Sequence, residues 1–212
     1  MADVKPKLVL ASASARRVAL LARVDLTPDL LNPADVDETP LRRETPRRLA
    51  IRLAELKAEK ASAAPLVKHL GDGTYILAAD TVVGLGRRIL PKALTRQEAE
   101  ECIALLSGRS HWVYSAVCLI DPKGRRTSAI SETKVRFKRF SRDDMKTYLA
   151  SEEWRGKAGG YAIQGRAESF VRYLSGSYSG VVGLPLHETI SLLQGAGYPI
   201  YTKWAQAGVT GR

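Results

Sequence analysis

The sequence predicts an α/β fold in which a mixed β-sheet is flanked by helices. Short apolar strands alternate with amphipathic helices near the start of the chain, which is typical of parallel pairing. Longer strands joined by tight turns dominate the middle, which is typical of antiparallel pairing. Neither an internal repeat nor a low-complexity linker interrupts the 212 residues, so we expect one domain that spans residues 1–212.

The elements of the first half follow from periodicity and turn signals. Leu8–Ala11 is a short apolar run that indicates a buried strand, and a helix is expected directly after it over residues 15–23. A second helix begins at Thr45–Pro46, where a capping residue precedes a proline, and it carries a leucine stripe on one face. The apolar run Tyr75–Val83 predicts a strand that turns at Gly84–Gly86 into a hairpin.

The middle of the chain contains a capped helix and a long hairpin. Thr95 and Glu98 form a capping box for a helix that ends at Gly108. Residues 111–120 and 127–140 have the composition of strands, and the Asp-Pro-Lys-Gly segment between them is a strong turn signal.

The last third combines a glycine-rich stretch with several further elements. Ser141 begins another capped helix, and the glycine-rich stretch covers residues 156–165. An apolar run follows over residues 170–174. A final helix is expected over residues 185–195, and residues 198–202 predict a closing strand.

The chain is strongly basic, with 33 Lys and Arg against 22 Asp and Glu, a formal net charge of +11. The basic residues are scattered in pairs, and no nucleic-acid-binding motif accompanies them, so we expect a small polyanion as the partner rather than a stable nucleic-acid complex. No apolar run approaches the roughly 18 residues of a membrane-spanning helix, which excludes a membrane protein. Two cysteines without metal or redox spacing favour a cytoplasmic setting.

The strand-to-helix turn over residues 12–17 is the first candidate site. Free backbone N–H groups at a helix start, with serine hydroxyls and the guanidinium groups of Arg16 and Arg17 beside them, can bind an anion. The alternative is that the serines only cap the helix and the arginines face water, and the pattern favours neither. The GxxxxGK[ST] spacing of a nucleotide-binding P-loop is absent from the sequence.

A carboxylate within an apolar strand is the second candidate. Asp80 follows two alanines and precedes Thr81 and two valines, where its burial is costly unless a partner is present. Such a carboxylate at a cleft can take a proton from water or hold a hard cation, and the alternative is a structural aspartate bonded to backbone or to a buried arginine. An acidic patch over residues 35–38 is either a turn or part of an Mg²⁺ site.

The glycine-rich stretch is the third candidate. Its four glycines let the backbone approach a ligand closely, while Lys157 offers charge and Gln164 offers hydrogen bonds; an ordinary mobile loop is the alternative. On pattern alone, Lys57 and Lys92 look like plain surface residues. The three histidines are far apart, so we expect them to be structural or solvent-facing rather than metal ligands.

Four motifs stand in order along the chain, namely LVLASASARR near the start, AADTVV, GKAGGYAIQG and SGSYSGVVGLPL. Together they resemble the Maf family of nucleoside triphosphate pyrophosphatases, and the resemblance covers residues 8 to 192. It implies a twisted mixed sheet with two lobes around a deep cleft, and a homodimer. It also implies hydrolysis of a nucleoside triphosphate to the monophosphate and pyrophosphate with a divalent cation, Mg²⁺ or Mn²⁺.

Roles for individual residues follow from this resemblance, position by position. Ser12, Arg16 and Arg17 match the family's phosphate-binding turn. Asp80 matches the catalytic aspartate, which accepts the proton of the attacking water, binds the metal, or does both. The other matching positions are Glu38, a metal ligand together with Asp80, and the substrate-binding residues Lys57, Lys92, Lys157 and Gln164.

The trio Arg16, Thr81 and Gln164 is similar to the branch of the family that prefers dTTP and UTP. The resemblance therefore implies hydrolysis of these two nucleotides or of modified pyrimidine nucleotides. The alternatives are the branch that acts on 7-methyl-GTP and a non-catalytic regulator of cell division that binds nucleotides or nucleic acid. Ala15 and Ala93 stand where the family often has proline, which loosens the backbone without removing a functional group.

Overall fold

The computed structural model describes residues 5–202 and 204–205. Its centre is a seven-stranded sheet with the order β2-β1-β3-β6-β7-β9, in which β4 also pairs with β3. Strands β1, β2 and β3 run parallel, whereas the other pairs are antiparallel, so the predicted mixed sheet is confirmed. The strands are β1 (Lys7–Leu10), β2 (Leu30–Leu31), β3 (Thr74–Leu85), β4 (Arg88–Leu90), β6 (Ser110–Ile120), β7 (Arg126–Phe137) and β9 (Val171–Ser175).

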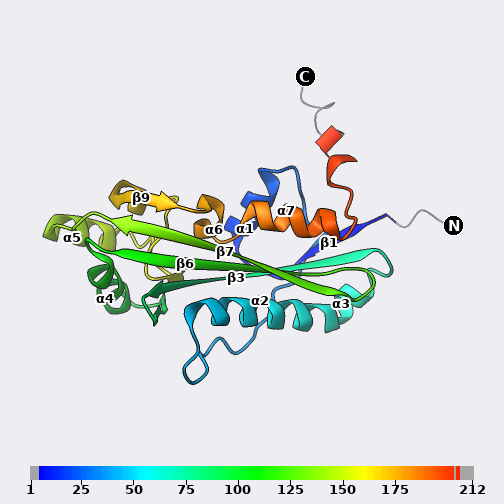
Figure 1. The fold of residues 1–212 in the computed structure, drawn as a ribbon, viewed down its shortest axis with the longest axis horizontal. Coiled ribbons are helices and arrows are strands. Elements are labelled where there is room, and N and C mark those ends of the chain that lie inside the picture. Colours follow the sequence, from blue (N-terminus) through cyan, green and yellow to red (C-terminus); the bar gives the residue numbers. More distant parts are fainter. Residues whose placement is uncertain (1–4, 203, 206–212) are drawn as a thin grey trace.

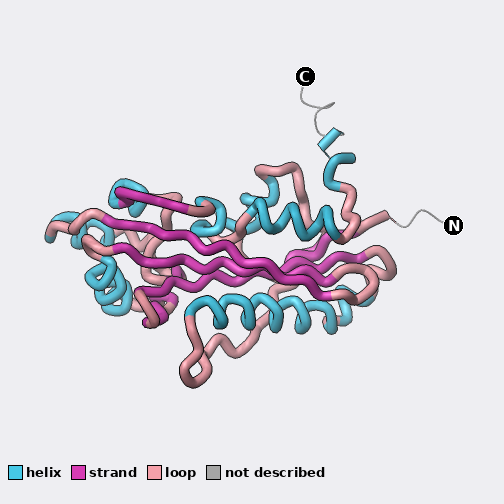
Figure 2. Tube along the Cα trace, viewed as in Figure 1, coloured by secondary structure: helices cyan, strands magenta, loops and turns pink. Residues whose placement is uncertain are grey.

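Helices cover both faces of the sheet (Figures 1 and 2). Helix α2 packs on one face of β3 and β6, α1, α6 and α7 lie on the other face, and α4 and α5 pack together near one end. Within the described part of the chain, no helix has the length and apolar character needed to cross a membrane. The helices are α1 (Ala15–Ala22), α2 (Pro46–Ala63), α3 (Pro65–Lys68), α4 (Arg96–Leu106), α5 (Arg142–Ala150), α6 (Tyr178–Val182) and α7 (Leu186–Gly195), with the 3₁₀ helix η1 (Arg166–Phe170).

The expected capping residues begin three of these helices. The Thr45 side chain accepts a hydrogen bond from the backbone of the first turn of α2. Thr95 with Glu98 and Ser141 with Asp144 both form complete capping boxes, at the starts of α4 and α5. These helix starts were local signals in the sequence, and the structure confirms them.

Strand β3 lies between two separate hydrophobic cores. Leu77 and Ala79 belong to the core under α1, α6 and α7, while Ala78 and Val82 belong to the core under α2. This alternation is the ordinary period of a strand, in which successive side chains point to opposite faces. Consecutive residues on β3 therefore lie in different environments. Asp80 and Thr81, which are neighbours in the sequence, thus belong to opposite faces of the sheet.

The predicted closing strand over residues 198–202 is wrong, because residues 200–202 are helical. Tyr198 and Ile200 are buried in the core on the α7 side, where the Tyr198 ring meets the Tyr75 ring edge to face at 5.1 Å. Pro199 suits this outcome, since proline lacks the N–H that a strand needs and fits the start of a helix. Strand β2 pairs with the outer side of β1 and forms that edge of the sheet.

The structure also contains a two-stranded sheet that the sequence did not predict. It pairs β5 (Lys92–Ala93) with β8 (Lys157–Ala158) in antiparallel register. Strand β8 lies inside the glycine-rich stretch, for which the sequence predicted no strand. Strand β7 also ends at Phe137 rather than at residue 140, because the register shifts there and the next backbone N–H bonds to the carbonyl of Phe170.

Candidate active site

Three adjoining pockets form one cleft beside the middle of β3. The inner pocket encloses about 560 Å³, with the open space at its mouth included, and is lined by α1, β3, α6 and the glycine-rich stretch. The outer pocket is lined by the turn between β1 and α1 with Glu38 and Lys57, and the apolar pocket by α2 and β4. Lys92 lines all three pockets. Every site residue predicted from the sequence lines at least one of them, so the fold brings all of these residues together.

The turn between β1 and α1 is organised around one serine. The Ser12 hydroxyl accepts hydrogen bonds from the Ser14 backbone N–H at 3.2 Å and from Arg17 Nη1 at 3.1 Å. Arg17 Nε also donates to the Gly183 carbonyl at 2.8 Å, which ties the turn to the end of α6. Ser14 precedes the first residue of α1, yet its side chain makes no capping hydrogen bond. The Ser14 side chain therefore does not cap α1, and the Ser12 hydroxyl instead holds the turn and Arg17 together.

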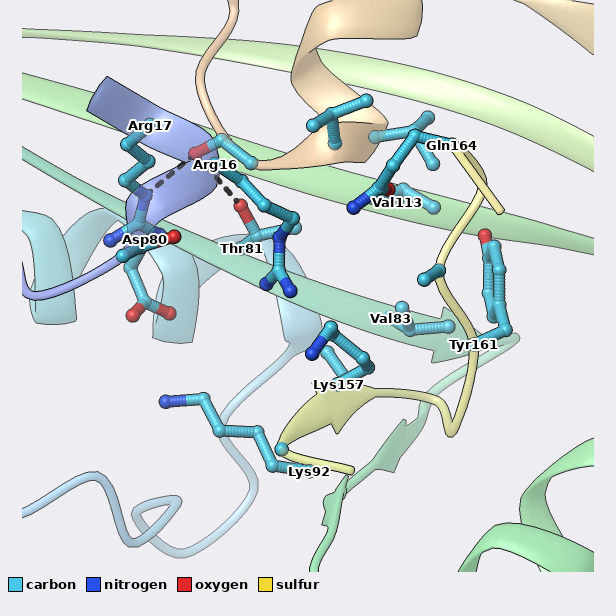
Figure 3. A pocket seen from close by; sticks show the side chains of 17 residues that line it. Arg16, Arg17, Asp80, Thr81, Val83, Lys92, Val113, Lys157, Tyr161 and Gln164 are labelled. Carbon is cyan, nitrogen blue, oxygen red and sulfur yellow. Dashed lines mark hydrogen bonds between the residues drawn. The ribbon is translucent and has the colours of Figure 1, made fainter. Parts of the chain in front are cut away.

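The two adjacent arginines of α1 differ in their contacts. Arg17 uses two of its nitrogens on protein acceptors. Arg16 points into the inner pocket (Figure 3) and makes no side-chain hydrogen bond to the described residues. Burial lowers the pKa of both guanidinium groups, and for Arg17 the negative charge of Asp80 opposes that effect. Arg17 thus holds the turn in place, while Arg16 presents its guanidinium to whatever occupies the pocket.

A row of alternating charges crosses the floor of the cleft. Lys57 Nζ on α2 lies 2.5 Å from Asp80 Oδ1 and 2.6 Å from Glu38 Oε1, and Glu38 also pairs with the Lys92 ammonium. Asp80 is 2% exposed and Lys57 is 7% exposed, so the ammonium of Lys57 compensates the buried charge of Asp80 while it also pairs with Glu38. The hydrogen-bond partner of Asp80 is Lys57 rather than backbone or an arginine, and the charge of Arg17 also interacts with it. Its second oxygen, Oδ2, takes no hydrogen bond from the described residues.

The electrostatics of the cleft favour an anion. Burial alone would raise the pKa of the Glu38 carboxyl, but hydrogen bonds from Lys57 and Lys92 outweigh it and hold this pKa below its ordinary value. Glu38 and Asp80 are the acidic groups of the three pockets. Five cationic side chains line the same space, so positive charge exceeds negative charge by three: Arg16, Arg17, Lys57, Lys92 and Lys157.

Two of these cations come from the small sheet of β5 and β8. Lys92 pairs with Ala158 across the two strands and Ala93 pairs with Lys157, so the two lysines reach the cleft from adjacent strands. Lys157 Nζ donates to the Arg155 carbonyl at 2.8 Å. Burial lowers the pKa of the Lys157 ammonium, and the positive charge of Arg16 lowers it further. Figure 3 shows Arg16, Lys92 and Lys157 around one common space.

The opposite side of β3 carries neutral polar groups. The Thr81 hydroxyl lies 3.0 Å from Ser115 Oγ and 3.4 Å from the Gly183 carbonyl oxygen. Gln164 lines the same pocket near Val113 (Figure 3), is exposed, and makes no side-chain hydrogen bond to the described residues. Its amide can therefore both donate to and accept from a ligand.

Sequence reasoning missed two features of this site for which a signal was present. Pattern alone placed Lys57 on the surface, but it lies one turn after Leu53 and two turns after Leu49 on the buried face of α2. A lysine within a helix's apolar stripe marks a buried partner. Ser115 was not considered, although it interrupts the inward-facing valines 113 and 117 of β6. A lone serine at a core position likewise indicates a buried hydrogen-bond partner.

His111 and the two cysteines are buried. His111 is buried, its Nε2 lies 2.8 Å from the Tyr161 hydroxyl, and burial lowers its pKa to about 4. Cys118 is also buried, and burial raises the pKa of its thiol to about 11. Within the described residues, no group of three or more His, Cys, Asp or Glu side chains gathers as a metal site would require on its own.

Comparisons with known proteins show the family of this chain. A family model described as Maf-like protein matches residues 7–196. The chain belongs to this family. A Maf-like relative from Rhodopseudomonas palustris, named dTTP/UTP pyrophosphatase, is 59% identical over 204 residues, covering 96% of this chain and 99% of its own length. A relative from Mesorhizobium japonicum with the same name is 56% identical over 201 residues, covering 95% and 97%.

Solved structures are similar at a greater distance. The Staphylococcus aureus Ham1 protein is 16% identical, with a TM-score of 0.42 over 62% of this Maf-like chain and 71% of its own. That similarity is too weak to assign function. The family membership therefore depends on the sequence relatives and the family model.

Proposed function

We propose that this Maf-like protein hydrolyses dTTP and UTP to the nucleoside monophosphate and pyrophosphate. The observation that carries the proposal is the position of Asp80, which lines an inner pocket where four cationic side chains lie beside the neutral polar side chains of Thr81 and Gln164. A nucleoside triphosphate likewise combines a charged end with a neutral end. Relatives that are 56–59% identical over nearly their whole length carry the name dTTP/UTP pyrophosphatase, which supports this substrate choice.

The triphosphate is expected to occupy the outer pocket and the adjoining part of the inner one. Its negative charges match the excess of positive side chains there, and guanidinium and ammonium groups form the strongest hydrogen bonds to phosphate oxygens. Arg16 has a guanidinium free to bind a phosphate. Lys57 and Lys92 already bind Glu38, so phosphate oxygens would share these two ammonium groups with that carboxylate.

Asp80 is proposed to accept the proton of the attacking water. The water oxygen forms a bond to the α-phosphorus, the bond from that phosphorus to the bridging oxygen breaks, and pyrophosphate leaves. Lys57 holds Oδ1 of Asp80 by a 2.5 Å hydrogen bond, which leaves Oδ2 to orient the water. Cationic side chains neutralise the charge that develops on the leaving pyrophosphate.

A divalent cation fits this donor set as a metal shared with the substrate. Mg²⁺ is commonly bound by one or two carboxylates together with substrate phosphates, and Glu38 and Asp80 supply two carboxylates beside the expected phosphate position. When bound, the cation would add positive charge where the triphosphate is most negative. The same donors would suit Mn²⁺.

The neutral side of the cleft is proposed to select the base. Uracil and thymine present a ring N–H between two carbonyl groups, whereas cytosine presents a bare ring nitrogen beside an amino group. The Gln164 amide N–H can donate to a base carbonyl, and the Thr81 hydroxyl lies across the same pocket. With Arg16 at the edge, this set matches the hydrogen bonds that uracil and thymine offer.

We also propose a cytoplasmic homodimer without a stable nucleic-acid partner. Two free, buried cysteines suit a reducing compartment, and the scattered basic pairs do not form a nucleic-acid-binding tract. Sedimentation of the purified protein would measure the oligomeric state. A monomer at micromolar concentration would contradict the dimer.

The activity is tested by pyrophosphate release from a panel of triphosphates, with and without Mg²⁺ or Mn²⁺. Preferred release from dTTP and UTP, dependent on the metal, is the expected result. Preferred release from 7-methyl-GTP would favour the other branch of the family. No release from any nucleotide, together with DNA binding that weakens steeply with salt, would favour the non-catalytic regulator.

A further inference from the structure

Ser115 is a buried residue on β6 that takes no part in the proposed reaction steps. It lies directly across from Thr81 in the antiparallel pairing of β3 with β6 and is 1% exposed. Its Oγ is 2.6 Å from the Gly180 carbonyl oxygen and 3.0 Å from Thr81 Oγ1. Ser115 does not line any of the three pockets of the cleft. Any effect of Ser115 on a bound substrate must therefore pass through Thr81, which it contacts.

The hydroxyl proton of Ser115 can occupy only one of these two contacts. Two oxygen atoms at 2.6 Å repel unless a proton lies between them, and the Gly180 carbonyl has no proton to give, so Ser115 donates to Gly180. Ser115 is then an acceptor toward Thr81. The Thr81 proton goes to Ser115 at 3.0 Å or to the Gly183 carbonyl at 3.4 Å, which already accepts from Arg17.

In both arrangements the Thr81 proton is bound by the protein. Thr81 Oγ1 then keeps its lone pairs as acceptors, and this residue lines the inner pocket. A free threonine hydroxyl can donate or accept with equal ease. The relay from Thr81 through Ser115 to Gly180 removes this freedom and leaves an acceptor.

We infer that Ser115 is a positioning residue that makes Thr81 a hydrogen-bond acceptor, so that the inner pocket takes a base with a ring N–H donor and rejects one with a bare ring nitrogen. The inference extends the proposed function, on which it rests. It names the ring N–H of a pyrimidine-2,4-dione, the form found in uracil and thymine, as the group that is recognised. Cytosine would bring two acceptors face to face at this point.

The wild-type protein supplies the first test, in which UTP is compared with its N3-methyl derivative and with CTP. Because both analogues lack the ring N–H, we expect kcat/KM to fall about 10²-fold for each, within the range that an unpaired buried polar group causes. dTTP, which adds a methyl group elsewhere on the ring, should keep kcat/KM close to that of UTP. Hydrolysis of N3-methyl-UTP as fast as UTP would overturn the inference.

The second test removes the relay. Ser115→Ala removes the nearer acceptor and leaves the Thr81 proton only the 3.4 Å contact with Gly183, so the hydroxyl can turn to donate to the ring nitrogen of cytosine. The ratio of kcat/KM for UTP to that for CTP should therefore fall about tenfold. Ser115→Thr keeps the hydroxyl and should restore the wild-type ratio. Thr189→Val is the matched control, since it removes another buried hydroxyl, which bonds to Pro185 within α7, and should leave the ratio unchanged.

The outcomes separate the inference from the proposed function. If the wild type releases no pyrophosphate from UTP or dTTP, the proposed function fails. If the wild type does so and Ser115→Ala slows UTP and CTP equally, as a merely structural role predicts, the inference fails and the proposed function stands. Thermal unfolding of each variant shows whether it is folded, and the N3-methyl-UTP comparison tests recognition of the ring N–H without any variant.

Discussion

The two faces of β3 contribute different chemistry to one cleft. On the α2 face, Asp80 lies in a row of alternating charges with Lys57 and Glu38. On the opposite face, the next residue, Thr81, takes part in neutral hydrogen bonds with Ser115 and Gly183. Charges attract a phosphate from many directions, whereas a hydroxyl or amide distinguishes donors from acceptors. We therefore expect the charged face to determine the rate with every nucleotide and the neutral face to determine which nucleotide is preferred.

Asp80→Asn tests the charged face and should have the largest effect. The amide cannot take a proton from water, so turnover should fall by at least ~10²-fold, the low end for loss of a general base. The fall should be the same for dTTP, UTP and CTP, because the base pocket is unchanged. Steady-state pyrophosphate release measures both quantities.

Asp121→Asn is the matched control for that variant. Asp121 is also buried, but it binds backbone N–H groups of the turn between β6 and β7, away from the cleft. It should retain wild-type turnover. Near-normal activity in a folded Asp80→Asn protein would show that Asp80 is not the base.

Lys57→Met tests whether the row of charges also stabilises the fold. It leaves the Asp80 carboxylate buried without its cationic partner, which should lower the free energy of unfolding by about 3 kcal/mol, the low end for breaking a buried pair. Urea denaturation measures this loss. The exposed Lys146→Met on α5 should change stability by less than about 0.5 kcal/mol.

The double variant Lys57→Met with Asp80→Asn sharpens the same point. Once Asp80 is neutral, the missing ammonium matters less, so the double variant should be more stable than Lys57→Met alone. Additive losses would indicate that the two charges do not depend on each other.

Gln164→Glu tests the neutral face. The change removes an amide donor that suits a base carbonyl and creates an acceptor that suits the cytosine amino group. The ratio of kcat/KM for UTP to that for CTP should therefore fall about tenfold. Gln97→Glu, on the exposed surface of α4, adds the same charge outside the cleft and should leave the ratio unchanged. Equal loss with every nucleotide would indicate a structural role for Gln164 instead.

Glu38→Gln should have the smallest effect and depends on pH. The folded-state pKa of Glu38 lies below the ordinary value of 4.5, so its ionised form favours folding. That stabilisation is fully present above about pH 4.5 and is lost as the pH falls through the lower folded-state value. The Glu38 side chain is 36% exposed, so solvent screening should keep the contribution below about 1 kcal/mol.

Denaturation of the wild type and Glu38→Gln at several pH values measures this contribution. The wild type should be the more stable protein near neutral pH, and the difference should shrink in acid. A difference that grows as the pH falls would contradict the assigned direction of the pKa shift.

Local signals in the sequence predicted much of the fold. The capping residues of α2, α4 and α5, the apolar runs of β1 and β3, and the turn between β6 and β7 each depend on a few neighbouring residues, and all of these elements formed. The closing strand over residues 198–202 failed for a different reason. Its alternation resembled that of a strand, but its environment was already decided by the core beside Tyr75 and by β2 at the sheet edge.

The identity of the site residues and their arrangement came from different sources. Motif order in the sequence was enough to name the residues of the cleft, because the family resemblance depends on residue type and spacing alone. It did not show that Lys92 and Lys157 lie on paired strands, that Lys57 is buried against Asp80, or that Ser115 supports Thr81.

The sequence by itself determined the basic balance, the helix starts, the alternation of β3 and the residue types available for chemistry. Only the tertiary structure decided which charges meet and which hydroxyl gives its proton to which carbonyl. The physical reason is that a cap or a strand period acts between near neighbours in the chain. A buried ion pair or a hydrogen-bond relay, in contrast, depends on distances between distant segments, which packing alone sets.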